Sequence, residues 1–129
     1  MKKVLFVCVE NSCRSQMAEA IFNSIAGGGA ESAGTNPAKE VDENAIKVMN
    51  EIGIDISGKR PKALTPDMNE KFDFIVTMGC IDGCPITPRE KTIEWDIEDP
   101  KGKGIEEYRM ARDEIKQNVK KLIERVEND

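Results

Sequence analysis

Short apolar runs alternate with amphipathic stretches along these 129 residues, and this alternation limits the folds that the chain can adopt. The runs at 4–7 and 72–78 are apolar and rich in β-branched residues, which is typical of strands buried on both faces of a parallel sheet. Weaker strands are predicted at about 30–33 and 93–97. The sequence therefore predicts four strands.

Between and after these strands, apolar residues recur at steps of three and four, which is the spacing of one helix face. This spacing predicts helices over 15–25 and 42–52 and a long helix from Ile105 onward, with Ser15 as the cap of the first. Strands that alternate with helices form βαβ units. We therefore expect an α/β fold with a single domain over 1–129, a three-layer sandwich in which helices flank a four-stranded parallel sheet.

Composition narrows the classes of function. The net charge is −5, and Lys and Arg do not cluster, so binding to nucleic acid is not expected. The apolar run that follows Lys3 is too short for a signal peptide or a membrane span, so we expect a cytoplasmic protein without a membrane association. We also expect a monomer that uses no cofactor. Because the chain has no histidine, Ser-His and Cys-His catalytic pairs are excluded.

The loop after the first strand carries the strongest chemical signal. Arg14 follows Cys8 by six positions, between a buried strand and the start of a helix. Such a loop directs backbone N–H groups and a helix dipole at one point, and Arg14 adds a planar fork, so the loop should bind a phosphate-like oxyanion. The same environment favours the thiolate form of Cys8, which is the nucleophilic form. The remaining residues of this oxyanion-binding loop are Val9, Glu10, Asn11, Ser12, Cys13 and Ser15.

A cysteine and an arginine can stand at this spacing by chance, and Cys8 would then be an inert core residue. The strand before and the helix after the loop argue against that interpretation. The stretch VLFVCVENSCRSQMAEA resembles the low-molecular-weight protein tyrosine phosphatase family, and is most similar to the arsenate reductases built on that fold. The resemblance implies that Cys8 is the nucleophile and Arg14 the oxyanion clamp. It also implies that Asn11 shapes the loop, that Ser15 donates its hydroxyl to the Cys8 sulfur, and that Cys13 supports the loop.

A second pair of cysteines, Cys80 and Cys84, follows the strand at 72–78, so it should face the Cys8 loop at the same sheet edge. The pair could be half of a zinc site, but no histidine or further pair completes one, and no metal is expected. Two incidental core cysteines are another alternative. The neighbouring glycines favour a loop that can move, which thiol–disulfide exchange requires.

The resemblance implies that these cysteines complete a relay for arsenic detoxification. Cys8 attacks arsenate, Cys80 releases arsenite by forming a disulfide with Cys8, and Cys84 then forms the Cys80–Cys84 disulfide. Thioredoxin or a low-molecular-weight thiol would reduce that disulfide. The sequence leaves open which of the two reductants acts and whether Cys80 or Cys84 attacks first.

Asp99 and Pro100 follow the strand at 93–97 and should lie at the same sheet edge. By itself an Asp-Pro pair is common in turns. Beside an oxyanion loop, Asp99 can serve as the general acid that protonates the departing oxygen. Some relatives bind potassium through equivalents of Asn11, Glu19 and Ser32, and here Lys62 is expected to replace the ion, so no potassium requirement is predicted.

Three functions remain after these steps. Arsenate reduction accounts for both the Cys8 loop and the Cys80–Cys84 pair. A phosphatase that hydrolyses phosphate monoesters through a phospho-cysteine needs only one thiolate, and its aromatic wall for phosphotyrosine is missing after Asp99, where Lys101, Gly102 and Lys103 stand. A redox sensor would use the same cysteines without turnover of arsenate.

Overall fold

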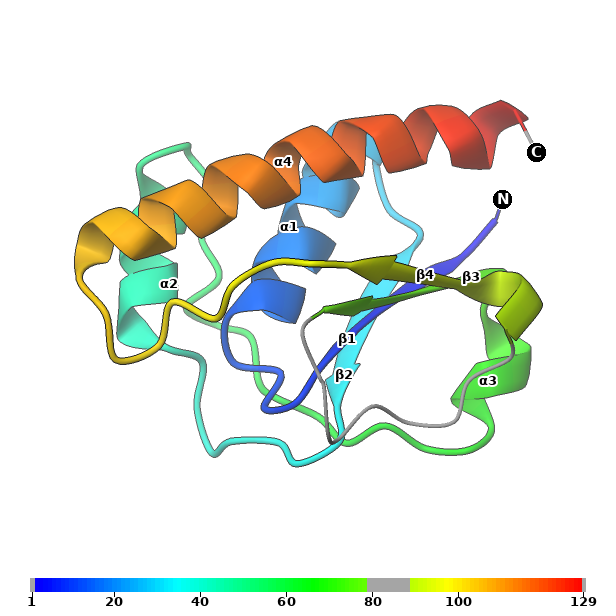
Figure 1. The fold of residues 1–129 in the computed structure, drawn as a ribbon, viewed down its shortest axis with the longest axis horizontal. Coiled ribbons are helices and arrows are strands. Elements are labelled where there is room, and N and C mark those ends of the chain that lie inside the picture. Colours follow the sequence, from blue (N-terminus) through cyan, green and yellow to red (C-terminus); the bar gives the residue numbers. More distant parts are fainter. Residues whose placement is uncertain (1, 79–88, 129) are drawn as a thin grey trace.

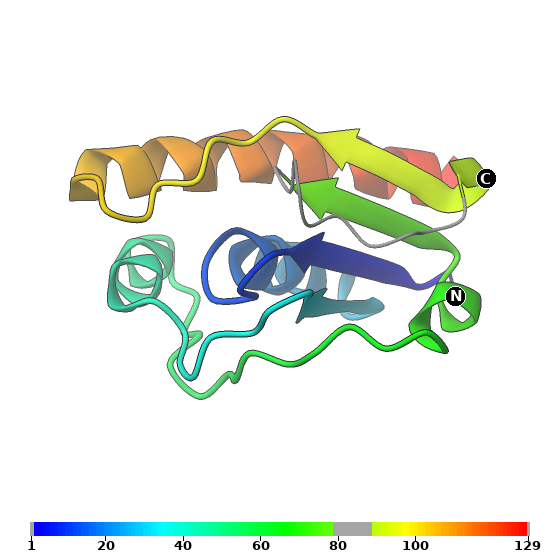
Figure 2. The same ribbon diagram turned by 60° about the horizontal axis from the view of Figure 1, so that its bottom comes forward.

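A computed structural model describes residues 2–78 and 89–128 of the chain. Its four strands form one parallel sheet in the order β2-β1-β3-β4, which Figure 2 shows face on. Each of the four strands predicted from the sequence is confirmed, with ends shifted by one or two residues. The strands are β1 (Val4–Cys8), β2 (Ala30–Gly34), β3 (Phe74–Met78) and β4 (Thr92–Trp95).

Strand β1 lies in the interior of the sheet, paired with β2 on one side and with β3 on the other. The chain moves from β1 to β2 and then crosses back over β1 to β3, so the strand order reverses at the carboxyl end of β1. Open parallel sheets bind ligands at such a reversal, because the loops on the two sides diverge there. Cys8, the last residue of β1, stands at this point, level with Gly34 of β2.

Three helices cover one face of the sheet and pack against one another (Figure 1). They are α1 (Arg14–Ala26), α2 (Glu43–Asn50) and α4 (Ile105–Asn128). All three were predicted, but the cap assigned to Ser15 was wrong. Helix α1 already includes Arg14, and the capping position falls on Cys13, whose side chain makes no capping hydrogen bond. Ser15 therefore lies inside the first turn, where its hydroxyl faces Cys8 instead of the helix end.

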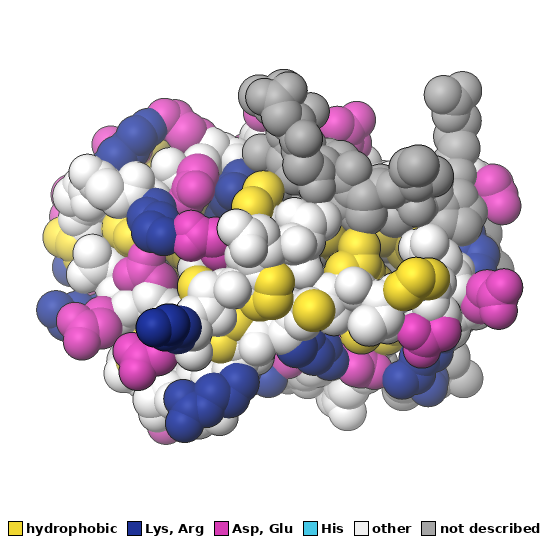
Figure 3. Space-filling view, turned by 90° about the horizontal axis from the view of Figure 1, so that it is seen from below, with side chains coloured by type: hydrophobic (Ala, Val, Ile, Leu, Met, Phe, Trp, Pro, Cys, Tyr) yellow, Lys and Arg dark blue, Asp and Glu magenta, His cyan; other side chains and the backbone are white. Residues whose placement is uncertain are grey.

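The other face of the sheet carries the one-turn helix α3 (Met68–Lys71) and the chain around Leu64, which gives the expected three layers. Successive residues of β1 alternate between the layers, since side chains along a strand point to opposite faces. Phe6 packs toward the helices, whereas Leu5 and Val7 pack with Phe72 on the second face. Seen from that side, apolar side chains gather in the middle of the face between charged ones (Figure 3).

Helix α4 is the longest helix among the described residues, and its buried residues, among them Ile115 and Val119, belong to the core. Its other side is highly charged. Accordingly, no helix within residues 2–78 and 89–128 combines the length and the apolar composition that crossing a membrane demands. The single-turn helices α3 and η1 (Arg89–Lys91) were not predicted.

An ion-pair network joins helices α2 and α4, and it should make the free energy of unfolding depend on pH in the acid range. The Glu51 carboxylate accepts hydrogen bonds from Arg109 at 3.0 Å and from Arg112 at 2.7 Å, and these bonds lower the pKa of Glu51 from 4.5 to about 2. A lowered pKa in the folded state stabilises the protein above the unfolded pKa, and that stabilisation is lost as the pH falls through the folded pKa. The relevant window therefore runs from about pH 4.5 down to about pH 2.

We expect Glu51→Gln to flatten the pH dependence of the free energy of unfolding in this window, because the glutamine cannot take up the proton. Urea unfolding of the wild type and the variant at several pH values between 2 and 7 measures this. Glu124→Gln, at an exposed position of helix α4, is the control. The prediction is contradicted when Glu51→Gln and the wild type lose the same free energy between pH 5 and pH 3.

Candidate active site

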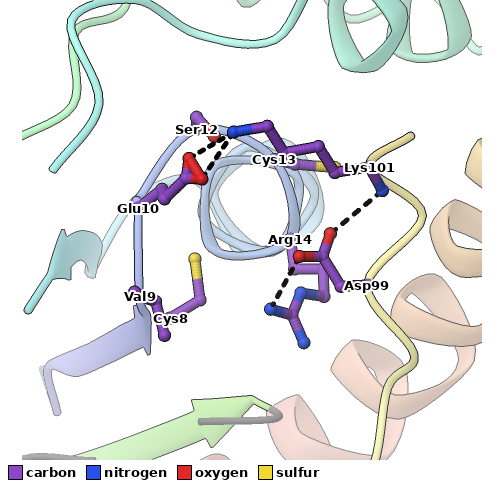
Figure 4. A pocket seen from close by; sticks show the side chains of 8 residues that line it. All are labelled: Cys8, Val9, Glu10, Ser12, Cys13, Arg14, Asp99 and Lys101. Atoms are coloured by element: carbon purple, nitrogen blue, oxygen red, sulfur yellow. Dashed lines mark hydrogen bonds and ion pairs between the residues drawn. The ribbon is translucent and has the colours of Figure 1, made fainter. Parts of the chain in front are cut away.

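The structure places Cys8 and Arg14 together in one cavity of about 260 Å³ at the carboxyl edge of the sheet. Cys8 ends β1 and Arg14 begins α1, and both are buried, with 3% and 6% of their surface exposed. Predicted site residues that line the cavity are Cys8, Val9, Glu10, Ser12, Cys13, Arg14 and Asp99, joined by Lys101 (Figure 4). Cys80 and Cys84 lie outside the described residues, so their predicted place in the site stays a prediction.

The loop is held by its carbonyl groups. Those of Val9, Glu10 and Ser12 each accept a hydrogen bond from a backbone N–H in the segment 36–42, at 2.8 or 2.9 Å. In a trans peptide the C=O and the following N–H point in opposite directions. The N–H groups that follow these carbonyls are therefore turned away from the supporting segment and are free to bind an anion beside the N-terminus of α1.

The contacts of Asn11 support the loop-shaping role that the resemblance implies for it. Its backbone adopts a left-handed conformation with φ of 52°, which asparagine tolerates better than most residues, and its side chain is fully buried. The Asn11 Oδ1 atom accepts the backbone N–H of Lys62 at 2.9 Å, and its Nδ2 donates to Ser15 Oγ at 2.7 Å. The loop is thus tied both to α1 and to the segment before α3.

The same chain of hydrogen bonds ends on the nucleophile. Ser15 Oγ lies 2.8 Å from Cys8 Sγ. Because Ser15 Oγ already accepts a hydrogen bond from Asn11, its own hydrogen is available for the sulfur. A donor at this distance stabilises a thiolate more than a neutral thiol. This geometry supports Cys8 as the nucleophile and Ser15 as its hydroxyl donor.

Arg14 reaches toward the loop after β4. Its Nη1 donates to the Ile97 carbonyl at 2.9 Å, and its Nη2 lies 3.7 Å from Asp99 Oδ2. The Asp99 side chain is half exposed and points into the cavity between Arg14 and Lys101 (Figure 4). A carboxyl group in this place can protonate an oxygen that leaves the bound oxyanion, which supports the role proposed for Asp99.

Cys13 shares the cavity but differs from Cys8 in its environment. Burial, together with the carboxylates of Asp42 and Asp99, raises the pKa of the Cys13 thiol well above its usual range. Cys13 therefore stays protonated and is a poor nucleophile at neutral pH. This supports the view that it packs beneath the loop and does not react.

A cation does stand beside Glu19, but it is not the one that the sequence suggested. Ser32 donates to Glu19 Oε1 at 2.7 Å, and the ammonium of Lys59 pairs with the other Glu19 oxygen. The Lys62 ammonium instead pairs with Glu31, at 2.7 Å. Glu31 and Ser32 are successive residues of β2 and point to opposite faces, so a lysine that reaches Glu31 cannot also reach Glu19. The absence of a potassium requirement stays a prediction, now based on Lys59.

Two contributors were missed by sequence reasoning. Gln16 donates to the Asn11 Oδ1 atom at 3.2 Å and to the Arg60 carbonyl at 3.2 Å, so it adds a further brace to the loop. Lys101 lines the cavity and pairs with Glu10. Gln16 could have been noticed because it follows Ser15 directly, whereas no local signal connects Lys101 with a residue 91 positions away.

Gly34 is the position where a side chain would most directly disturb the loop. A Cβ atom added there would lie 2.6 Å from the Val9 carbonyl oxygen and 2.9 Å from the Asn11 nitrogen. Both neighbours are backbone atoms of the anion-binding loop, which cannot move away without changing the site. The loop and β2 therefore approach each other as closely as glycine allows.

We expect Gly34→Ala to weaken oxyanion binding by about tenfold or more, since small displacements of a binding loop have large effects. The measurement is protection of Cys8 against alkylation by increasing concentrations of inorganic phosphate. Gly58→Ala is the matched control, because a Cβ atom at Gly58 meets nothing within 4 Å. Equal protection in both variants would show that the loop accommodates the methyl group.

Comparison with known proteins agrees with this geometry. Residues 3–129 match the family described as low molecular weight phosphotyrosine protein phosphatase, and the chain belongs to this family. It is 37% identical to a glutaredoxin arsenate reductase of Synechocystis, over 98% of this chain and 99% of that protein. The Staphylococcus epidermidis protein named arsenate reductase 1 is 39% identical, over 97% of this chain and 98% of that protein.

Solved structures show the same relationship. The crystal structure of an arsenate reductase from Archaeoglobus fulgidus is similar with a TM-score of 0.80 and 40% identity, covering 94% of this chain and 98% of that one. An arsenate reductase in its phosphate-binding state is similar with a TM-score of 0.87 and 36% identity, covering 97% and 98%. The predicted fold class is therefore confirmed.

Proposed function

We propose that this chain reduces arsenate to arsenite, with Cys8 as the nucleophile. The observation that carries the proposal is the position of Cys8 Sγ. It lies in a cavity shared with Arg14 and Asp99, with Ser15 as its hydrogen-bond donor. The similarity to proteins named arsenate reductases, over nearly the whole chain, directs this oxyanion chemistry toward arsenate.

The reaction begins when the Cys8 thiolate attacks arsenic. An S–As bond forms and an As–O bond breaks, and Asp99 protonates the oxygen that leaves as water. Arsenic keeps its oxidation state of +5 in this adduct. The loop N–H groups and the Arg14 guanidinium hold the remaining oxygens, whose charge would otherwise repel the thiolate.

The reduction itself takes place when a second thiolate, which we assign to Cys80, attacks the Cys8 sulfur. The S–As bond breaks, its electron pair remains with arsenic as arsenite, and a Cys8–Cys80 disulfide forms. Cys84 then attacks Cys80 and frees Cys8, leaving a Cys80–Cys84 disulfide. An external reductant, either thioredoxin or a small thiol, supplies the two electrons that reduce the Cys80–Cys84 disulfide and restore the enzyme. We place this chemistry in the cytoplasm and in a monomer.

Hydrolysis of phosphate monoesters is the second candidate, because Cys8, Arg14 and Asp99 would also suffice for a phospho-cysteine mechanism. One observation disfavours phosphotyrosine as the substrate. None of the described residues that line the cavity is aromatic, so none of them offers a wall for a phosphotyrosine ring.

The deciding experiment measures arsenite release from arsenate with a thioredoxin system, a glutaredoxin system and a small thiol, beside hydrolysis of an aryl phosphate. Sustained arsenite release with any of the three reductants is the expected result. Absence of arsenite under all three conditions, together with rapid ester hydrolysis, would overturn the proposal in favour of a phosphatase. Cys8→Ser serves as the inactive control in both assays.

A further inference from the structure

A salt bridge joins the two loops on either side of the cavity. The Lys101 ammonium donates to both carboxylate oxygens of Glu10, which stands 91 positions earlier in the chain. Both residues line the cavity that holds Cys8. In Figure 4 the Lys101 side chain extends from the Asp99 loop, past Cys13, to Glu10 on the opposite loop.

The pair stands on the solvent side of this cavity. The Lys101 and Glu10 side chains are 53% and 32% exposed, whereas Cys8 is only 3% exposed. The pair therefore forms the outer, more exposed part of the cavity lining, and Cys8 the deeper part. Lys101 also turns back to its own loop, where its backbone N–H donates to Asp99 Oδ1 at 3.1 Å.

The charges show why the two residues belong together. A carboxylate two positions after the nucleophile would repel an incoming anion if it stood alone. The hydrogen bond that Lys101 donates to Glu10 raises the pKa of Lys101, so the lysine keeps its charge at neutral pH and neutralises the carboxylate. The pair is thus neutral as a unit, and its remaining effect on a substrate is its bulk.

We propose that the Glu10–Lys101 bridge selects substrates by size, admitting free tetrahedral oxyanions to Cys8 and hindering esters that carry an organic group. The inference rests on the proposed function, because it assumes that oxyanions are attacked at Cys8. It gives the site a specificity determinant where none of the described lining residues is aromatic. Glu10 and Lys101 act by controlling access and do not take part in bond making.

The expected strength of this selection follows from the exposure of the pair. An exposed ion pair favours its closed form over its open form by a factor of about five at most. A bulky molecule that requires the open form then reacts more slowly by the fraction of open molecules, so removing the bridge should accelerate it about fivefold. A small molecule that fits past the closed bridge should gain little.

The test uses two uncharged thiol reagents of different size, iodoacetamide and N-phenylmaleimide, with the rate of Cys8 alkylation read by peptide mass spectrometry. The ratio of the two rates cancels any change in the reactivity of the thiolate itself. We expect the double variant Glu10→Ala/Lys101→Ala to raise the maleimide-to-iodoacetamide ratio about fivefold over wild type. Lys101→Glu, which places two like charges opposite each other, should raise it as well.

The matched control is Glu98→Ala/Lys103→Ala. It removes another exposed ion pair from the same loop, leaves the net charge unchanged as the test variant does, and lies outside the Cys8 cavity. An unchanged ratio in both Glu10/Lys101 variants, or an equal rise in the control, would overturn the inference. Because alkylation does not require arsenate reduction, a failure to release arsenite would refute the proposed function without affecting this readout.

Discussion

The substitutions Cys80→Ser and Cys84→Ser should each stop repeated arsenate reduction, because the relay needs both thiols to return Cys8 to its free form. The two variants should differ in the first turnover. Without the thiol that attacks Cys8, the arsenic adduct cannot release arsenite at all. Without the other thiol, each enzyme molecule should release one arsenite and stop with Cys8 in a disulfide. The number of arsenite molecules released per enzyme molecule, measured with excess reductant, distinguishes no turnover, a single turnover and multiple turnover.

The assignment of Cys80 as the first attacker predicts no arsenite from Cys80→Ser and about one equivalent from Cys84→Ser. The reverse pattern would exchange the two roles while keeping the relay. Full multiple turnover in both variants would refute the relay. Protection of Cys8 by inorganic phosphate, measured on each variant, serves as the control that the oxyanion loop remains intact.

Replacement of Arg14 by lysine should reduce kcat/KM for arsenate by about a hundredfold to a thousandfold, although the charge is kept. The lysine cannot bind two oxygens at once, and it loses the geometry that holds Arg14 to the Ile97 carbonyl at 2.9 Å. Asp99, which stands 3.7 Å from the guanidinium, would also lose the partner that holds it over the cavity. Steady-state kinetics with the wild type and the variant measures the loss.

Arg109→Lys is the control for this substitution, because Arg109 forms its ion pairs with Glu51 and Glu106 on the surface, away from the cavity. We expect that control to retain wild-type kinetics. A decrease of less than about fivefold in Arg14→Lys would show that charge alone suffices at this position and that the fork geometry is unimportant. Thermal unfolding of the variant separates a catalytic loss from a loss of structure.

The arrangement also explains why a chain without histidine can carry this chemistry. In the proposed mechanism Cys8 reacts as a thiolate without a base, because Ser15 Oγ lies 2.8 Å from its sulfur and helix α1 begins just after the loop. The only proton donor that the proposed reaction requires is a carboxyl group, and Asp99 lies at the cavity. Oxyanion binding and thiol activation thus use the same positive environment.

The sequence by itself determined the parts of this protein whose physical cause is local. Continuous apolar runs identified β1 and β3, because strands buried on both faces carry apolar residues throughout, and weaker runs identified β2 and β4. Apolar residues at steps of three and four identified helices α1, α2 and α4, because burial of one helix face imposes a repeat of about 3.6 residues. The Cys8 loop was recognisable because Cys8, Asn11, Arg14 and Ser15 lie within eight consecutive residues. Helix α3 escaped prediction because four residues are too few to show a period.

Only the tertiary structure decided the contacts between distant segments. It showed that Lys59, and not Lys62, pairs with Glu19. This pairing depends on which face of β2 each lysine reaches. It also brought Lys101 across the cavity to Glu10. Such pairings depend on how strands and loops are placed side by side after the chain has crossed the sheet, and neither residue type nor local spacing records that placement.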